Sequence, residues 1–380
     1  MSRSGKRPID AGVFEEIVRI NRELYARTDV WVVPDHVWEG LDDEQRMLLL
    51  AELQRISAAP FAASVGRIQA EPLALRLVSR GFPELLARIR KLEPFQLGVR
   101  YTGLRLIDFG GESFVFRGRD ESTMRDVVVK MSFVDFSGAA RVDVEQLRRR
   151  RRRLRKEAAV LARMHGTVLP DLVDELQDQN PFFPRSFPPF LRAEEVFVVM
   201  EYIAGTRFDL HVRHLHREGR GCCARGRTLQ LAIAFLDLQR EIADRLGAAS
   251  IYTDIKPENA LVGERIRIVD ASSVHLADED GPAHVSELYL DPEDHRAWAA
   301  GALRLDDGYV LRSVARCVRM LATNAPAVIG AALPPWPDTT PAAFRASIDD
   351  LPGAVTLARA TTALQTLLPE LACSHRSHPG

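Results

Sequence analysis

Apolar and polar positions alternate along two stretches in the middle of the chain, residues 101–120 (YTGLRLIDFGGESFVFRGRD) and 125–136 (RDVVVKMSFVDF). Both stretches are rich in β-branched and aromatic residues, a pattern typical of antiparallel strands. The apolar run at 197–203 (FVVMEYI) predicts one more strand. The pattern therefore predicts a β-rich section that begins near Tyr101.

Helical spacing of apolar residues predominates on both sides of this section. Residues from about Asp10 to Leu92 predict helices, and Asp42 with Gln45 forms a capping-box-like pair ahead of one of them. A basic helix is expected around 147–159, and a long helix over 228–247. Since the pattern is helical again from Asp306 onward, the chain is expected to be an α+β protein.

Residues 251–272 (IYTDIKPENALVGERIRIVDAS) place two carboxylates, an amide and an ammonium within one short span: Asp254, Asp270, Asn259 and Lys256. Two short β-type runs flank a turn that contains Gly263, which predicts a hairpin. Such a hairpin would bring Asp270 back beside Asn259. Convergent oxygen ligands suit Mg²⁺, and a nearby lysine suits phosphate.

Composition narrows the class of protein without identifying it. The chain has 380 residues, 46% hydrophobic and 27% charged, with a formal net charge of −1. These values are ordinary for a globular protein, and no global field attracts nucleic acid, so nucleic-acid binding is not expected. The cysteine spacing suggests no disulfide framework, and neither a signal peptide nor an apolar run of membrane-spanning length is found. We expect a cytoplasmic protein, with delivery as a secreted effector as the alternative.

Other features bear on phosphate chemistry. A glycine pair, Gly110 and Gly111, lies in a tight turn between two expected strands, where bare backbone could approach a phosphate. Lys130 ends an apolar strand, so it needs a partner, a ligand or access to water. A carboxylate, Glu157, follows on the basic helix and could point inward toward that lysine.

Taken in order, these motifs resemble the eukaryotic-type (Hanks-type) serine/threonine protein kinase domain, in divergent form, from about Leu104 to Leu368. The resemblance implies a bilobal protein-kinase-like fold over residues 96–372, with a small β-rich N-lobe over about 96–203 and a larger helical C-lobe over about 204–372. A helical N-terminal region, residues 1–95, would precede it. ATP and Mg²⁺, with Mn²⁺ as a substitute, are the implied cofactors.

The resemblance also implies roles for individual residues. Asp254 would be the catalytic base, and Lys256 would lie beside the transferred phosphate. Asn259 and Asp270 would bind the metal. The residues implied in nucleotide binding are Gly110, Gly111, Val115, Lys130, Glu157, Met200, Glu201 and Ile203. Asp307 would be the aspartate that the family buries beneath the catalytic loop, although a simple helix N-cap also explains the acids at that position.

The chain departs from the family pattern at several positions. Tyr252 and Thr253 replace the usual His-Arg before the catalytic aspartate, so a phosphate–arginine pair cannot order the activation loop. We therefore expect activity that does not depend on phosphorylation of that loop. The thinned glycine loop, and Ala271 and Ser272 after Asp270, would weaken nucleotide affinity or alter metal use.

Lys256 and Pro257 favour a serine or threonine hydroxyl of a protein as acceptor. The alternatives are a pseudokinase scaffold that binds nucleotide and partners, and a kinase of a small-molecule hydroxyl. The arginine run Arg148–Arg153 is either a solvated helical face or a docking site for an acidic partner, nucleic acid or anionic lipid. Phenylalanines between 182 and 190 are expected to cover the β-rich section or the N-terminal helices rather than recruit a partner. A zinc site at the histidines and cysteines of 211–223 fits no familiar spacing.

Overall fold

The computed structural model describes residues 88–89, 91–110, 112–134, 142–183, 187–188, 195–279, 283–324, 332–333, 335–354 and 356–371. The expected N-terminal helices therefore lie almost wholly outside the described residues. The rest forms a mixed α/β structure of two compact units. The first contains the described residues up to Leu154 together with Glu175–Val199, and the second contains Arg155–Asp174 and the described residues from Met200 onward.

A six-stranded sheet forms most of the first unit, in the order β1-β2-β3-β4-β6-β5. Neighbours from β1 to β4 are antiparallel, as the alternating pattern predicts. The strands are β1 (Phe95–Leu97), β2 (Tyr101–Phe109), β3 (Ser113–Asp120), β4 (Arg125–Ser132), β5 (Leu172–Asp178) and β6 (Glu195–Glu201).

One face of this sheet carries an aromatic core. Phe114 and Phe116 alternate along β3 and are fully buried. Phe182 comes from the aromatic segment ahead of β6, and its ring stacks on Phe116 at 5.6 Å and meets Phe95 edge-on at 5.1 Å. The prediction that this segment covers the β-rich section is confirmed for Phe182, whereas Phe190 lies outside the described residues.

Helix α6 (Val144–Arg163) carries the arginine run, and part of that run pairs within the first unit. Arg150 donates to the carbonyl of Phe133 at 2.6 Å, and Arg151 donates to the fully buried Glu195 at 3.3 Å. Arg153 forms a 2.9 Å ion pair with Glu112. These arginines anchor the helix, and the acidic partner of the run stays a prediction.

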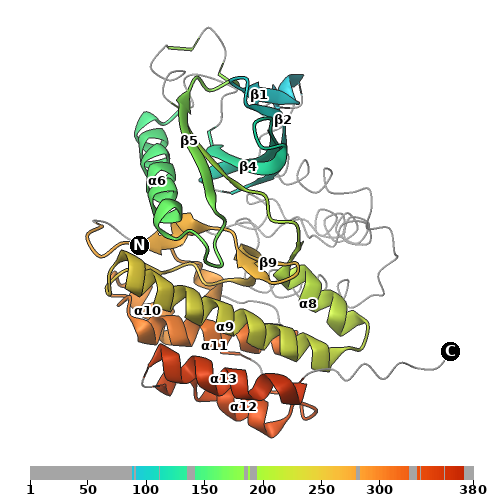
Figure 1. Ribbon diagram of the computed structural model, residues 1–380. Coiled ribbons are helices and arrows are strands. Elements are labelled where there is room, and N and C mark those ends of the chain that lie inside the picture. Colours follow the sequence, from blue (N-terminus) through green and yellow to red (C-terminus); the bar gives the residue numbers. More distant parts are fainter. Residues whose placement is uncertain are drawn as a thin grey trace, which may run out of the picture. The chain divides into compact units, whose positions relative to one another are not determined.

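The second unit is built mainly of helices (Figure 1). Helix α9 (Gly221–Leu246) is its centre: α8 (Phe208–Arg217), α11 (Asp307–Thr323) and α13 (Leu357–Leu371) all pack against it. Helix α12 (Ala342–Asp349) packs on α11 and α13. The short helix α10 (Pro292–Ala299) begins at Asp291, whose side chain accepts hydrogen bonds from two backbone N–H groups.

Short strands and turns of this unit hold the polar segment that the sequence singles out. One sheet has the order β10-β9-β7 and another pairs β11 with β8. The strands are β7 (Thr206–Arg207), β8 (Ile251–Tyr252), β9 (Ala260–Val262), β10 (Ile266–Ile268) and β11 (Val274–His275). Single 3₁₀ turns complete it: η2 (Pro257–Asn259), η3 (Ala271–Ser273), η4 (Glu287–Tyr289) and η5 (Leu351–Gly353).

Two sequence expectations concern the chain as a whole. Among the described helices, none combines the length and the apolarity that crossing a membrane requires. Cys223 is disulfide-bonded, and Cys317 is a buried free thiol. The cysteine spacing, which suggested no disulfide framework, gave no sign of this bond.

Candidate functional site

The predicted hairpin forms and brings two polar segments together. Strands β9 and β10 pair antiparallel with Ile268 opposite Ala260, and the N–H of Val269 donates to the carbonyl of Asn259 at 2.9 Å. A Cβ at Gly263 would lie 2.8 Å from the carbonyl oxygen of Ala204, so this turn requires glycine. Asp270, the next residue after Val269, consequently lies close to Asn259.

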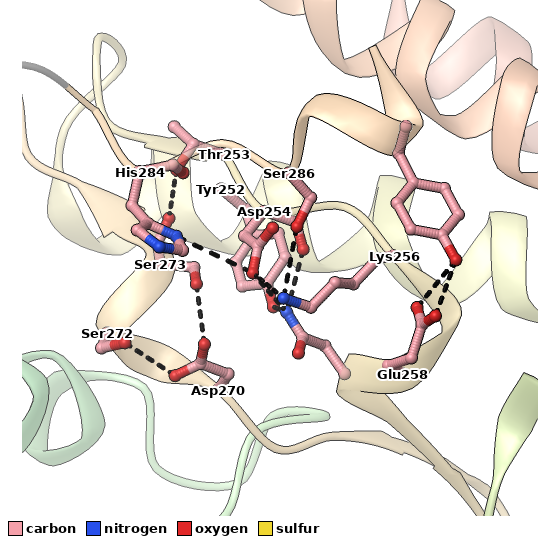
Figure 2. A network of polar contacts seen from close by, with 12 residues as sticks. Tyr252, Thr253, Asp254, Lys256, Glu258, Asp270, Ser272, Ser273, His284 and Ser286 are labelled. Atoms are coloured by element: carbon pink, nitrogen blue, oxygen red, sulfur yellow. Dashed lines mark hydrogen bonds and ion pairs between the residues drawn. The ribbon is translucent and has the colours of Figure 1, made fainter. Parts of the chain in front are cut away.

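Asp254 is the centre of the site (Figure 2). Its side chain is fully buried, and its Oδ2 accepts hydrogen bonds from Lys256 Nζ at 2.5 Å and from Asn259 Nδ2 at 3.1 Å. Its Oδ1 is also buried but has no hydrogen-bond partner among the described residues. A buried carboxylate oxygen without a donor is costly, so this atom is suited to receive one from a ligand.

Asn259 is oriented through its amide nitrogen. Nδ2 lies within hydrogen-bond distance of the Tyr252 hydroxyl at 3.2 Å and of the Asp254 main-chain oxygen at 3.0 Å, besides Asp254 Oδ2. The amide oxygen must therefore point the opposite way. An amide oxygen directed away from the protein network is a suitable ligand for a hard cation.

The Asp270 side chain is oriented by Ser272 and Ser273, the two residues after Ala271. Ser272 Oγ donates to Asp270 Oδ1 at 2.7 Å, and Ser273 Oγ donates to Oδ2 at 2.9 Å (Figure 2). Burial raises the pKa of the Tyr252 phenol well above its usual range, and the charges of Asp270 and Asp254 raise it further. Tyr252 therefore stays neutral and adds no charge to the site.

Thr253 connects the site to the segment 283–290. Its main-chain nitrogen and its hydroxyl oxygen each lie 2.9 Å from the main-chain oxygen of Ser273. The hydroxyl oxygen also lies 2.6 Å from the main-chain oxygen of His284. Lys256 Nζ also lies 3.3 Å from Ser286 Oγ. The segment is thus attached at several points where the family pattern would use an arginine and a phosphate.

A buried pair of oxygen groups holds the end of the same segment. The hydroxyl of Tyr289 lies 2.8 Å and 2.9 Å from the two carboxylate oxygens of Glu258. Burial and the charge of Asp209 raise the pKa of Glu258, and burial raises that of Tyr289. This contact couples η4 to η2, the turn that carries Asn259.

The expectation for Asp307 is wrong. Asp307 is exposed, and its neighbour Asp306 caps α11 by accepting the N–H of Tyr309 at 3.0 Å. The group buried beneath residues 252–254 is instead the Tyr309 side chain, whose hydroxyl donates to the main-chain oxygen of Thr253. The helix begins so that the capping residue faces solvent while the tyrosine, one turn later, faces inward.

The predicted nucleotide-contacting residues of the β-rich section lie on β3, β4 and the turn between β2 and β3. Val115 and Lys130 are direct partners in the β3–β4 register, so both lie on the sheet face opposite the aromatic core. Lys130 is 7% exposed. The N–H of Gly110 donates to the Ser113 carbonyl at 2.9 Å, whereas Gly111 lies outside the described residues.

The remaining predicted nucleotide residues belong to the second unit. Glu157 is buried on α6, and Met200 is buried on β6. The carboxylate of Glu201 is engaged by Arg267, whose guanidinium nitrogens lie 2.6 Å and 3.3 Å from its oxygens. Ile203, which follows β6, is partly exposed. The roles assigned to these residues stay predictions.

No group of three or more His, Cys, Asp or Glu side chains able to hold a metal occurs within the described part of the chain. At the zinc alternative, His216 lies 2.8 Å from the Leu321 carbonyl and His214 pairs with Glu218, so these rings have protein partners. The oxygens of Asn259 and Asp270 fit Mg²⁺ better, because this cation takes few protein ligands and completes its shell with phosphate and water.

Sequence reasoning missed several residues that shape the site. The hydroxyls of Ser273 and Thr253 and the phenol of Tyr309 all hydrogen-bond to atoms of the segments that carry Asp254 and Asp270. Ser273 directly follows the altered triplet, and Thr253 itself departs from the family pattern, so these departures were the signal that could have identified both residues. We interpreted the departures as a sign of weakened function and did not predict the hydrogen bonds that the substituted residues make.

The chain was compared with models of protein families and with curated proteins, and it matches neither a family model nor a curated protein.

Proposed function

We propose that the chain is an ATP- and Mg²⁺-dependent phosphotransferase with a bilobal protein-kinase-like fold, and that it acts on a serine or threonine hydroxyl of a protein. The order of motifs from the glycine turn to Asp270 supports the fold. The convergence of Asp254, Lys256 and Asn259 supports the chemistry.

One observation carries the proposal: Asp254 Oδ1 is buried and has no hydrogen-bond donor among the described residues, while Oδ2 of the same carboxylate has two. An acceptor hydroxyl would supply the missing donor. Asp254 would then orient the hydroxyl and take its proton as the oxygen attacks phosphorus. Because Oδ2 is held by Lys256 and Asn259, the carboxylate is fixed in direction before the acceptor arrives.

Lys256 would serve both partners of the reaction. Its ammonium lies 2.5 Å from Asp254 Oδ2, and one more donor position can face the phosphoryl group as negative charge develops on it. Ser286, 3.3 Å away, limits where that ammonium can swing. Positioning of this kind accounts for most of the catalysis in phosphoryl transfer.

Asn259 and Asp270 would hold the metal through the amide oxygen and the carboxylate. When bound, Mg²⁺ supplies charge neutralisation on the nucleotide phosphates. The chain's own contribution is to direct the two oxygen ligands, through Nδ2 of Asn259 and through the serine hydroxyls on Asp270. The roles expected of Lys130 and Glu157, binding and orienting the phosphates, are part of the same proposal.

The acceptor class rests on Lys256 and Pro257, the pattern typical of protein rather than small-molecule kinases. Segment 283–290, attached through Thr253, Lys256 and Glu258, would offer the surface beside which a polypeptide is placed. A general protein substrate, such as a basic or acidic phosphoacceptor protein, is therefore the appropriate assay partner.

Transfer of labelled phosphate from ATP tests the proposal. We expect Asp254→Asn, which keeps the shape of the side chain, to lower the transfer rate by about 100-fold or more while nucleotide binding is retained. Asp278→Asn, a change at an exposed carboxylate, is the matched control and should transfer like wild type. Wild-type protein that transfers phosphate no faster than Asp254→Asn would overturn the proposal.

A further inference from the structure

Asp270 receives a hydroxyl on each carboxylate oxygen from consecutive residues of one turn. Ser272 Oγ lies 2.7 Å from Oδ1 and Ser273 Oγ lies 2.9 Å from Oδ2 (Figure 2). Both serines belong to η3, which starts directly after Asp270. The turn therefore folds its side chains back over the carboxylate that precedes it, and it holds that carboxylate from two sides.

Ser273 is itself fixed by the catalytic loop. Its main-chain oxygen accepts hydrogen bonds from the N–H and the hydroxyl of Thr253, and the next residue, Val274, pairs with Tyr252 across β11 and β8. The serine is 2% exposed. Its main chain therefore cannot move away from Asp270 unless this local strand pairing shifts as well.

Ser272 is less constrained. It is partly exposed, and the described contacts give its side chain one partner, Asp270 Oδ1. The two serines therefore differ in rigidity although they make equivalent hydrogen bonds. A role in orienting Asp270 should depend more strongly on Ser273 than on Ser272.

We propose that Ser272 and Ser273 are positioning residues for a divalent cation: they hold the Asp270 carboxylate in the orientation in which it binds the metal. This inference rests on the proposed function. Each carboxylate oxygen has more than one lone pair, so accepting a hydroxyl leaves room for a metal. Partners that hydrogen-bond to a metal ligand fix its orientation, and their removal typically weakens metal binding 10- to 100-fold.

Direct binding of Mn²⁺ in the presence of a non-hydrolysable ATP analogue, followed by electron paramagnetic resonance, tests the inference without relying on turnover. We expect Ser273→Ala to weaken Mn²⁺ binding by roughly 10-fold, Ser272→Ala by less, and Ser273→Thr, which keeps the hydroxyl, to stay closest to wild type. Binding of the analogue without metal should be unchanged in all three variants.

The matched control is Ser347→Ala on α12, which removes a partly buried serine hydroxyl outside the site. Thermal unfolding of each variant shows whether it is folded, and Ser272→Ala, at the more exposed position, provides the second measurement if Ser273→Ala unfolds. The Mg²⁺ concentration that gives half-maximal phosphate transfer should rise in the same order among the variants.

The outcomes separate the inference from the proposed function. Wild-type protein that binds no Mn²⁺ with nucleotide would contradict the proposed function, and the inference would fall with it. If wild type binds Mn²⁺ and both alanine variants bind it equally well, the inference alone is wrong. Loss of analogue binding without metal in Ser273→Ala would also overturn it, because the serine would then support the fold rather than the cation.

Discussion

Two fully buried aspartates differ in how completely their carboxylate oxygens are hydrogen-bonded. Both oxygens of Asp120 are satisfied: Arg100 donates at 3.0 Å and 2.8 Å, and the Ser122 hydroxyl donates at 2.6 Å. Asp254 is equally buried, yet one of its oxygens lacks a donor within the described residues. Burial of an unpaired polar atom costs stability, so the difference is expected where a site serves a ligand.

The phenol of Tyr309 offers a test at this scale. Its hydroxyl donates to the main-chain oxygen of Thr253 in a buried environment. We expect Tyr309→Phe to lower the free energy of unfolding by about 1–3 kcal/mol, because the Thr253 carbonyl would lose a donor where water cannot replace it. Urea unfolding followed by circular dichroism measures the change. A variant as stable as wild type would show that this hydrogen bond contributes nothing.

At the scale of elements, the start of α11 shows how one position decides a role. Asp306 caps the helix, and Asp307, the first helical residue, is exposed. Partial burial of its carboxyl and the neighbouring charge of Asp306 raise the pKa of Asp307. The two acids are adjacent in the chain, but only the side chain of Asp306 accepts the capping hydrogen bond, so they form a matched pair for mutation.

We expect Asp306→Ala to cost about 1 kcal/mol of stability, the usual effect of losing an N-cap side chain. Asp307→Ala should change stability by less than about half of that, since its side chain accepts no cap hydrogen bond. Thermal unfolding of both variants under the same conditions gives the comparison. Equal losses would mean that the charge of the first turn, rather than the cap geometry, stabilises the helix.

The elements of the site differ in how far the sequence predicts them. The hairpin around Gly263 is a local structure, set by short β-type runs and a turn that requires glycine, so its pattern predicts it correctly. The place of Tyr309 depends on which residue begins α11, a boundary that apolar spacing defines only loosely. The grip of Ser273 on Asp270 depends on pairing between β8 and β11, two strands too short to leave a readable pattern.

At the scale of the whole molecule, paired carboxylates link stability to pH. Burial alone would raise the pKa of Asp209, but hydrogen bonds and charge from Arg207 and Arg213 hold it below the usual value. Hydrogen bonds from Arg100 likewise lower the pKa of Asp120. A carboxyl whose folded pKa is lowered adds stability above its unfolded pKa, near 4, and that contribution is lost as the pH falls through the folded value.

Asp209→Asn is therefore expected to destabilise the protein most at neutral pH and progressively less below pH 4, as wild type loses the same contribution. Urea unfolding at pH 7, 5 and 3.5 checks this, with the exposed Asp244→Asn as control. Glu258, whose pKa is raised by burial and by Asp209, opposes the trend without reversing it at Asp209. A destabilisation that is constant with pH would show that Asp209 acts through packing and not through charge.

The broad architecture follows from the sequence more readily than its long-range contacts. Alternation predicts the β-rich section, and helical spacing predicts the helical section, because both patterns are local. Partners of the arginine run could not be foreseen: Arg151 finds Glu195, which is 44 residues away along the chain. The aromatic segment was an intermediate case, since its apolarity required burial but did not specify Phe116 as the neighbour of Phe182.

The hydroxyl of Thr253 has a consequence for how such a protein could be controlled. It ties the loop of Asp254 to segment 283–290 through the main-chain oxygen of His284 and also lies within hydrogen-bond distance of the Ser273 main-chain oxygen; Thr253 is 1% exposed. A tie of this kind carries no charge that a phosphatase could strip or a second enzyme could restore. The arrangement would be in place as soon as the chain has folded, so the proposed phosphotransferase would need no phosphorylation to attach this segment to the loop of Asp254.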